Sequence, residues 1–470
     1  MSGATSSTAE LSATEMLAEY RAGRLSPVEV ARDALDRIEA VDGAVNAYCH
    51  LDRERTLADA AAAEERYREG EPHGLLDGVP VSIKDILLSR GWPTLRGSRT
   101  VERDQAWDVD APAVARLREH NAVLVGKTTT PELGWKGVTD SPLTGVTRNP
   151  WDTDKTAGGS SGGASAAVAT GTSPISIGTD GGGSVRIPAS FSGVFGIKPT
   201  YGLVPLFPAS PYGTLAHVGP LSWTVEDSAI ALDVLSGPDS RDWTAGPRPD
   251  RPMTSTLEAG IAGMRIAFSP TLGFATVDPE VASIVAAAAK SFADLGARVE
   301  LVDPRIADPV EAFHVLWFAG AAASIAALSA EQRAQLDPGL LEVCEEGASR
   351  SALDYVAATA VRAEVGRIMG EFHEHFDLLL TPTMPIAAFD AGMEVPSGSQ
   401  AHRWTAWTPF TYPFNMTQQP AASVPCGFTS SGLPVGLQVV GPKHADARVL
   451  TACRAYEQAH PWQGKRPPMG

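Results

Sequence analysis

Two clusters of glycine and serine stand out between residues 157 and 186. The first is Gly158–Gly163 (GGSSGG) and the second is Gly181–Ser184 (GGGS). Glycine loses more conformational freedom on folding than any other residue, so two such clusters beside serines need a structural reason. Glycine lets the backbone approach a reacting group closely and point its N–H donors at it. Flexible loops are the alternative, but linkers do not usually enclose a helix and a strand, which the small residues 164–169 and the apolar residues 174–177 predict here. The pattern favours a reaction site.

Lys84 is the second residue that could do chemistry. Val79, Val81 and Ile83 alternate with other residues, which predicts a strand over residues 79–86 with Lys84 near its end. A lysine held away from water has a lowered pKa, and its neutral amine can act as a base. A lysine that extends from a strand end into solvent fits the same residues. Considered alone, the strand favours the lysine that extends into solvent.

Together these stretches resemble the amidase signature family of serine hydrolases. The resemblance covers about the whole chain and is densest from Gly78 to Thr200. The motifs that carry it are Gly78-Val79-Pro80 with Lys84-Asp85, Gly126-Lys127-Thr128 with Pro131-Glu132, Asn149-Pro150-Trp151, the GGSSGG cluster, Gly178-Thr179-Asp180, Gly182–Pro188 (GGSVRIP) and Gly196–Thr200 (GIKPT).

The resemblance implies a catalytic triad made of two serines and a lysine. The nucleophile position falls on Ser184, the middle serine on Ser160, which follows a cis peptide bond from Gly159, and the base on Lys84. A hydroxyl is a poor nucleophile at neutral pH and needs a base within hydrogen-bond reach. Neutral Lys84 would take the proton of Ser184 by way of Ser160, and the protonated relay would then deliver a proton to the leaving amine. The three side chains are therefore expected to lie in contact in series.

The resemblance also implies the groups around this triad. The backbone N–H groups of Gly181, Gly182, Gly183 and Ser184 are the candidate oxyanion hole. Relatives often carry a branched apolar residue where this chain has Gly181. Supporting roles fall on Gly159, Ser161, Asp180 and Arg186, with Arg186 expected to pair with a buried carboxylate.

The substrate pocket is expected to come from other parts of the chain. In the family, segments corresponding to residues 201–223, 309–350 and 384–412 shape it. Among single residues, four apolar side chains are candidates for contact with an aryl or hydrophobic substrate: Trp92, Leu95, Trp404 and Trp407.

Strands and helices alternate along the chain, which predicts a sheet with much parallel pairing. Strands are predicted at residues 79–86, 122–125, 264–268, 298–302, 377–381, 420–424 and 436–440. Helices are predicted at residues 13–22, 27–41, 53–69, 111–120, 225–235, 279–295 and 447–459, with mainly helical structure over 309–374. The resemblance implies an α/β fold with one large twisted mixed sheet covered by helices on both faces. We expect a disordered tail at residues 1–8 and a single amidase domain over 9–470, with its catalytic core at about 76–200.

Composition narrows the possible partners and compartment. The 470 residues include 38 basic and 55 acidic ones, a net charge of −17, which disfavours non-specific binding to nucleic acid or to anionic membranes. The four cysteines lie far apart without zinc spacing, and the polar N-terminus has no apolar segment of a signal peptide. We expect a cytoplasmic monomer or homodimer that acts on a small amide and water, without a metal or cofactor.

Two other functions fit parts of the sequence. Residues 158–162 satisfy the GxSxG pattern of Ser–His esterases, but that elbow follows an apolar strand, and the preceding NPWDTDKTA is polar. A transamidase subunit of a tRNA-dependent amidotransferase is the other alternative, which needs partner chains and a supply of ammonia. The motifs favour a stand-alone amidohydrolase that cleaves the C–N bond of carboxylic amides. The expected pocket residues favour aryl or hydrophobic amides, with esters and carbamates as further substrates.

Overall fold

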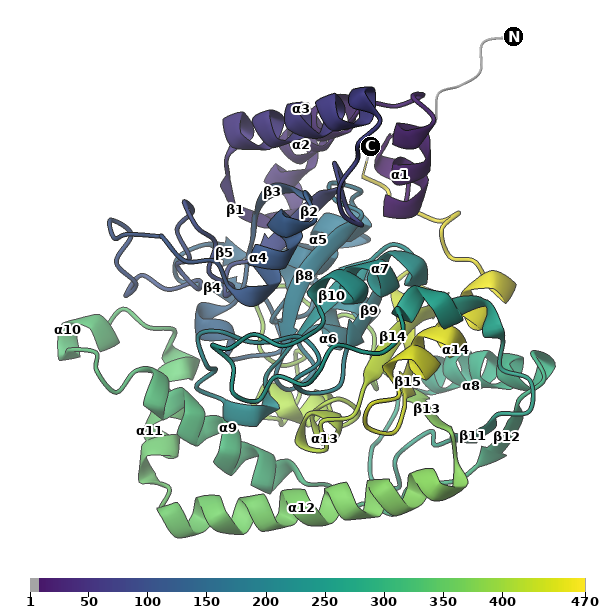
Figure 1. Cartoon of the computed structure of the whole chain (residues 1–470). Coiled ribbons are helices and arrows are strands. Elements are labelled where there is room, and N and C mark those ends of the chain that lie inside the picture. The colour runs from purple at the N-terminus through teal and green to yellow at the C-terminus, as the bar shows by residue number, and fades with distance from the viewer. Residues whose placement is uncertain (1–7, 470) are drawn as a thin grey trace.

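The computed structural model describes residues 8–469 and folds them around one large β-sheet (Figure 1). Its eleven strands are β1 (Tyr48–Leu51), β2 (Pro80–Lys84), β3 (Val123–Thr128), β8 (Ile175–Asp180), β9 (Phe195–Lys198), β10 (His217–Ser222), β11 (Arg265–Phe268), β12 (Arg298–Leu301), β13 (Leu378–Pro382), β14 (Ala421–Phe428) and β15 (Pro434–Val440). Two small ladders lie outside it: β4 (Asp140–Ser141) pairs with β5 (Gly145–Val146), and β6 (Arg148–Asn149) pairs with β7 (Asp152–Thr156).

The large sheet is mixed, and its strand order is β1-β3-β2-β8-β10-β9-β14-β15-β13-β11-β12. β2 pairs in parallel with both β3 and β8, and β11 pairs in parallel with β12 and β13, whereas the remaining pairs are antiparallel. Because β2 and β8 are parallel neighbours, the ends of both strands, at Lys84 and Asp180, lie at the same edge of the sheet. The second glycine–serine cluster directly follows β8 at this edge.

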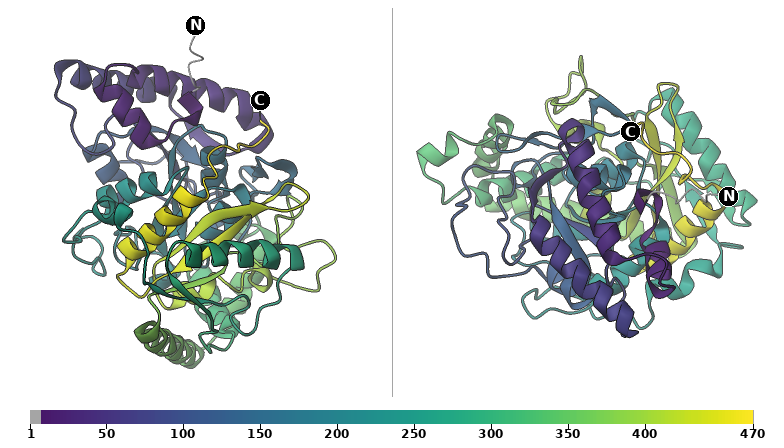
Figure 2. Two further views of the ribbon diagram at one scale, coloured as in Figure 1. Left: turned by 90° about the vertical axis from the view of Figure 1, so that its right-hand side faces the viewer. Right: turned by 90° about the horizontal axis from the view of Figure 1, so that it is seen from above.

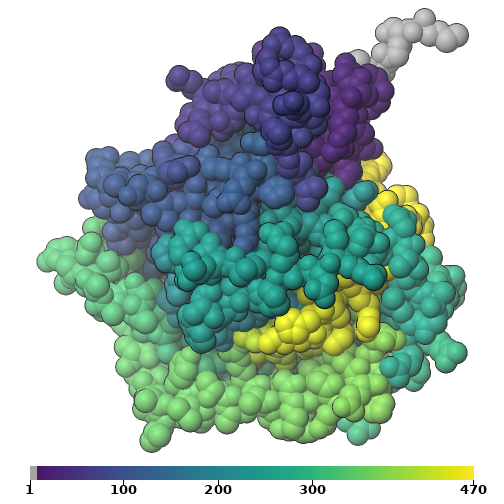
Figure 3. Space-filling model, in the orientation of Figure 1, coloured from purple at the N-terminus to yellow at the C-terminus, as the bar shows by residue number. Residues whose placement is uncertain are grey.

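Helices connect the strands. They are α1 (Ala13–Arg21), α2 (Pro27–Val45), α3 (Arg53–Glu69), α4 (Pro112–Glu119), α5 (Gly162–Ala169), α6 (Arg186–Ser192), α7 (Val225–Leu235), α8 (Pro279–Asp294), α9 (Val310–Ser324), α10 (Ala330–Arg333), α11 (Pro338–Ser349), α12 (Ala352–His375), α13 (Tyr412–Met416) and α14 (Asp446–Ala459). In Figures 1 and 3 the N-terminal helices α1–α3 and the helices α9–α12 occupy opposite ends of the molecule.

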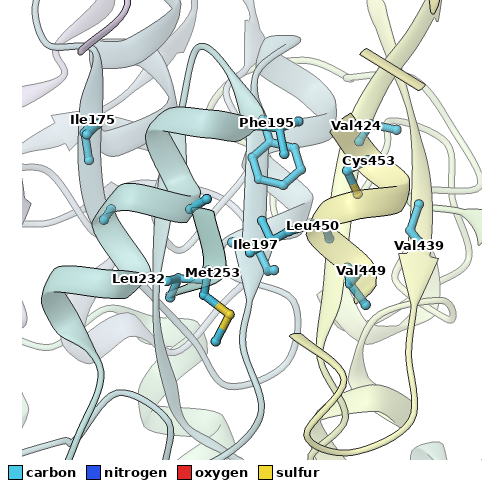
Figure 4. Packing of buried hydrophobic residues seen from close by; sticks show 14 of the residues in the cluster. Ile175, Phe195, Ile197, Leu232, Met253, Val424, Val439, Val449, Leu450 and Cys453 are labelled. Atoms are coloured by element: carbon cyan, nitrogen blue, oxygen red, sulfur yellow. The ribbon is translucent and has the colours of Figure 1, made fainter. Parts of the chain in front are cut away.

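Both faces of the sheet are covered by helices. Along β13, Leu378 and Leu380 belong to the core shared with α4, α7, α8 and α14, while Leu379 belongs to a second core with α12. This division follows from the alternation of side chains along a strand. Figure 4 shows part of the first core, where Val449 and Cys453 of α14 lie among strand residues. The expected α/β fold with helices on both faces is confirmed.

The N-terminal helices are tied to the rest of the chain by hydrogen bonds at their ends. Ser26 and Glu29 form the capping box predicted for α2. The carboxylate of Asp227, in α7, accepts hydrogen bonds from the backbone N–H groups of Ala13 and Thr14 at the start of α1. Figure 2 shows the chain end returning to this group of helices, where Arg37 donates to the carbonyl of Met469.

Most predicted elements are present within a few residues of their expected bounds, and three strands of the large sheet are additional. These are β1, β9 and β10, of which β9 and β10 lie in the middle of the sheet. The stretch over residues 201–223 was expected to border the active site, and its last part, Pro220 included, is strand β10. Of the expected tail at residues 1–8, all but Thr8 lies outside the described residues, and Thr8 begins a 3-10 helix (Thr8–Glu10).

Candidate active site

Lys84 is fully buried at the end of β2. Its Nζ lies within hydrogen-bond distance of three hydroxyl groups: Ser160 Oγ at 2.7 Å, Ser161 Oγ at 2.9 Å and Thr179 Oγ1 at 2.9 Å. Burial lowers the pKa of Lys84 well below its ordinary value, and the charge of Asp180 opposes this only in part. The structure therefore has the buried amine that the family resemblance implies, and not the solvent-extending lysine that the strand alone favours.

Ser160 follows Gly159 through a cis peptide bond and directly precedes the start of α5. The backbone here is packed so tightly that only glycine fits at 159, because a Cβ at this position would meet the carbonyl group of Val138 at 2.5 Å. Gly158 has φ of +77°, a conformation that favours glycine. The first cluster of glycines thus serves a close approach that places the Ser160 hydroxyl against Lys84.

Ser184 lies in the turn between β8 and α6, and its side chain is nearly buried. Ser160 and Ser184 both line a single cavity of about 280 Å³. Within residues 8–469, the hydroxyl of Ser184 has no hydrogen bond to Ser160 or to any other protein group. The structure thus contains the contact between Lys84 and Ser160, and it places the second serine of the expected relay in the same cavity without a direct bond. Catalytic contacts are often long before substrate binds and shorten in the reacting complex.

The four backbone donors expected at the oxyanion hole are not equivalent. The N–H of Gly183 donates to Asp180 Oδ1 at 2.8 Å, so this donor is occupied. In the part of the chain that the structure describes, the N–H groups of Gly181, Gly182 and Ser184 have no acceptor. Gly181 and Ser184 also line the cavity, so their N–H groups are open to a substrate oxygen, and the N–H of Gly182 belongs to the residue beside Gly181 in the same turn.

Asp180 and Arg186 hold this turn in place. Arg186 donates to both carboxylate oxygens of Asp180 at 3.0 Å, and both side chains are fully buried. Asp180 also accepts from the N–H groups of Gly183 and Val185. Burial alone would raise the pKa of Asp180, but the adjacent Arg186 guanidinium lowers it below its ordinary value. The expected pairing of Arg186 with a buried carboxylate is present.

Aromatic and apolar groups form most of the cavity wall. Residues 206–212 supply one side, including Phe207 and Tyr212, and α9 supplies Trp317. The rings of Tyr212 and Trp317 are stacked with centroids 3.7 Å apart, and Trp317 Nε1 donates to the carbonyl of Trp135. A Cβ at Gly181 would meet the Trp317 ring at 2.7 Å. The indole of Trp317 thus fills the space that a side chain at position 181 would need.

The four residues expected to contact substrate are elsewhere, which corrects that expectation. None of them is among the residues lining the cavity. Trp92 is buried in the core and donates to Asp52, and Leu95 lines separate surface clefts. Trp404 lies behind the wall, with its ring against Gly182, and Trp407 stacks on Phe191.

The aromatic residues that do line the cavity lie in two of the segments that the family resemblance indicated, 201–223 and 309–350. Sequence reasoning assigned no contact to Phe207, Tyr212 or Trp317 in them. The signal that could have found Trp317 is Gly181 itself, because the missing side chain there leaves room for a ring from elsewhere.

Histidine takes no part in the contacts of the two serines. His217, at the start of β10 beside the end of β8, is buried, and its Nδ1 lies 2.8 Å from the carbonyl oxygen of Leu215. Burial lowers the pKa of His217 well below its ordinary value. Across residues 8–469, no histidine forms a hydrogen bond with Ser160 or Ser184.

Two further classes of feature are absent from the described residues. Within residues 8–469, no three side chains of His, Cys, Asp or Glu are grouped so that they could hold a metal ion. None of the described helices combines the length and the apolar character needed to span a membrane.

Known proteins are similar to this chain in sequence and in arrangement. The sequence matches the amidase family over residues 29–450. It is 39% identical over 464 residues to an acylamidase of Rhodococcus erythropolis, with 97% of each chain covered. It is 34% identical over 471 residues to a glutamyl-tRNA(Gln) amidotransferase subunit from Chloroflexus aggregans, covering 95% of this chain and 96% of that protein.

Solved structures agree with the sequence comparison. A bacterial aryl acylamidase of the amidase signature family superimposes with a TM-score of 0.91 at 34% identity, covering 97% of both chains. A 6-aminohexanoate cyclic dimer hydrolase superimposes with a TM-score of 0.89 at 28% identity, covering 98% of this chain and 99% of that one. The chain therefore has the fold of a family of amide-bond enzymes. It belongs to the amidase signature family, as its motifs indicated.

Proposed function

We propose that this chain is a stand-alone amidohydrolase that cleaves the C–N bond of carboxylic amides through an acyl-enzyme on Ser184. The observation that carries the proposal is the environment of Lys84. The amine is fully buried among three hydroxyl groups, and it forms no ion pair with a carboxylate of the described residues. A buried lysine without a paired acid loses its proton readily, and its neutral amine is a base.

A neutral amine at Lys84 can satisfy all three of these contacts. Such an amine has two N–H donors and one lone pair. Ser161 Oγ donates its own proton to the carbonyl of Thr179 at 3.1 Å, so it must accept from Lys84. Ser160 has no other partner among the described residues, so its proton is free to move to the lone pair of Lys84. This arrangement supports the role of Ser160 as the group that passes a proton.

In the reaction, Ser184 Oγ attacks the carbonyl carbon while its proton passes through Ser160 to Lys84. The negative charge that forms on the carbonyl oxygen is stabilised by the N–H groups of Gly181, Gly182 and Ser184. The relay returns the proton to the nitrogen, the C–N bond breaks and the amine leaves. Water then attacks the acyl carbon with the same relay as base, which releases the acid and restores Ser184.

The substrate that fits best is an aryl or hydrophobic amide. The cavity is lined largely by apolar groups, with aromatic rings at Phe207, Tyr212 and Trp317. The names of two similar proteins, an acylamidase and an aryl acylamidase, support this class. Esters and carbamates present the same acyl carbon to the serine, so they belong to the proposed range.

The alternative is a transamidase subunit, because the chain is similar to amidotransferase subunits over most of its length. Such a subunit works with partner chains on a charged tRNA. The net charge of −17 favours the stand-alone enzyme, since contact with the phosphates of tRNA requires basic surfaces.

The test is a screen of the purified chain against anilides, esters and carbamates of graded size. We expect hydrolysis of at least one anilide and its loss in Ser184→Ala. Ser255→Ala, which removes an exposed hydroxyl far along the chain, is the matched control and should keep full activity. Full activity of Ser184→Ala would refute the mechanism.

A further inference from the structure

Arg96 is the only charged side chain among the described residues that line the cavity. The other lining residues are apolar, glycine or hydroxyl-bearing, and the two catalytic serines are among them. Arg96 is half-buried. Within residues 8–469, its guanidinium forms no hydrogen bond and no ion pair. An arginine carries five N–H donors and stays charged in proteins, so these donors are available to a bound molecule.

The backbone of Arg96 is held firmly, although its side chain is free. Arg96 has φ of +57°, which is uncommon for a residue other than glycine. Its carbonyl accepts a hydrogen bond from the N–H of Leu133, which also lines the cavity. The loop before it is fixed by Lys127, whose Nζ donates to Thr94 Oγ1 at 2.6 Å and to the carbonyl of Leu87 at 2.9 Å.

The acid whose charge acts on Arg96 is Asp85, and it is already paired with another residue. Asp85 forms an ion pair with Lys127 at 3.3 Å, and the backbone N–H groups of Arg96 and Gly97 face the same carboxylate. Burial lowers the pKa of Arg96, and the charge of Asp85 opposes this. Of the other charged groups of the site, Asp180 is paired with Arg186, and Lys84 is the proposed neutral base. Among the described residues, the cavity thus presents one positive charge without a partner.

We propose that Arg96 is a specificity residue that binds a carboxylate carried by the substrate. The inference rests on the proposed function and names its substrate class: amides of aryl or apolar compounds that also bear an acidic group. The planar guanidinium matches a carboxylate with two parallel hydrogen bonds, and the partly buried setting strengthens them. Phe207, Tyr212 and Trp317 would contact the apolar part of the same molecule.

The experiment uses two pairs of substrates that differ only in the acidic group. Succinyl 4-nitroanilide is compared with butyryl 4-nitroanilide, which places the acid on the acyl side. N-acetyl 4-aminobenzoate is compared with N-acetyl 4-toluidine, which places it on the amine side. The quantity measured is the ratio of kcat/KM for the acidic and the neutral member of each pair, in the wild-type protein and in variants at position 96.

We expect Arg96→Met to lower this ratio about tenfold or more in at least one pair, mainly through KM, because a hydrogen bond to a charged group is lost. Arg96→Lys should retain part of the ratio. The matched control is Arg99→Met, which removes an exposed arginine of the same loop and should leave the ratio unchanged. Turnover of the neutral substrates shows that the variants are folded. A ratio that changes less than about twofold in both pairs would overturn the proposal.

A binding measurement separates this inference from the proposed function. Ser184→Ala protein is titrated with benzoate and with benzamide, and we expect tighter binding of benzoate that is lost when Arg96→Met is added. If the wild-type protein hydrolyses no amide but this preference is present, the proposed function fails and the carboxylate site stands. If amides are hydrolysed but the preference is absent and the ratios are unchanged, the carboxylate site fails alone.

Discussion

Lys84 is the residue on which the proposed chemistry depends most directly. Its amine is surrounded by hydroxyl groups, and the nearby carboxylate of Asp180 is engaged by Arg186 at 3.0 Å. Burial would deprive a charged amine of solvation in this position, which is the main reason the pKa of Lys84 lies well below 10.5, and the charge of Asp180 opposes this shift. Ser184, in contrast, contacts no base among the described side chains, so the proposed mechanism needs the relay to take its proton.

The pH dependence of hydrolysis tests this residue. The active form is the neutral amine, so kcat/KM should rise with pH as Lys84 loses its proton, and the rise should be complete well below 10.5. Lys84→Met should lower kcat/KM by about 10²–10⁴ and remove the rise. Lys290→Met, at an exposed position of α8, serves as the control and should keep the wild-type profile. A wild-type profile without any rise toward alkaline pH would exclude the lysine base.

Among single residues, the sequence motifs predict the candidate catalytic positions, but they do not predict the residues that line the cavity. The positions of Lys84, Ser160 and Ser184 follow from motifs that are specific as a set, and the structure brings all three to one edge of the sheet. The substrate-contacting residues could not be predicted in the same way. The sequence offers the same reason to place Trp92 and Trp404 at the substrate, namely a large aromatic side chain. Whether such a ring faces a cavity or the core depends on packing between distant segments.

Among the elements, α9 matters most for the shape of the cavity because it carries Trp317. This helix packs against α11, and the two come very close at Gly347, where a Cβ would meet the carbonyl oxygen of Phe318 at 1.9 Å. Glycine at 347 therefore lets the two helices touch. Any larger residue there must push α9, and with it Trp317, away from its present position.

Gly347→Ala is expected to lower the free energy of unfolding by about 1–3 kcal/mol, because the contact is with backbone and cannot be relieved by a side-chain rotation. It should also raise KM for aryl substrates through the displacement of Trp317. The control is Gly366→Ala in α12, where a Cβ meets nothing within 4 Å and the better helix propensity of alanine should be neutral or stabilising. Denaturant unfolding and steady-state kinetics measure both effects, and equal stability of the two variants would contradict the argument.

Elements were predicted well where periodicity was clear and poorly where it was interrupted. Helices α3 and α7 have the bounds that their sequence pattern indicates. β10 was missed because Pro220 is unusual in a central strand. Pro220 is tolerated because it lies outside the pairing between β10 and β9, which includes only Leu221 and Ser222 of β10.

On the scale of the whole molecule, the site is assembled from segments far apart in the chain. The reacting groups come from residues 84–184, and the cavity wall comes from residues 206–212 and from α9. The sheet joins them, and its order could not be predicted from the sequence. Local patterns identify strands but do not specify that β14 and β15 stand between β9 and β13.

The stand-alone function is tested on the intact chain. We expect the pure protein to elute from gel filtration as a monomer or homodimer and to hydrolyse an anilide without a partner chain. Added tRNA should leave the rate unchanged, because the net charge of −17 disfavours contact with its phosphates. Activity that appears only when tRNA and further subunits are supplied would support the transamidase alternative.

Gly181 and Trp317 together have an evolutionary consequence. The ring of Trp317 occupies the volume that the missing side chain of Gly181 leaves empty. The same volume of the cavity wall could therefore be filled by a side chain at position 181 or by a ring at position 317. A lineage that acquired a branched side chain at 181 would first have to lose the large ring at 317. The order of such replacements is therefore constrained, and redesign of the cavity at position 181 requires that position 317 be varied in the same library.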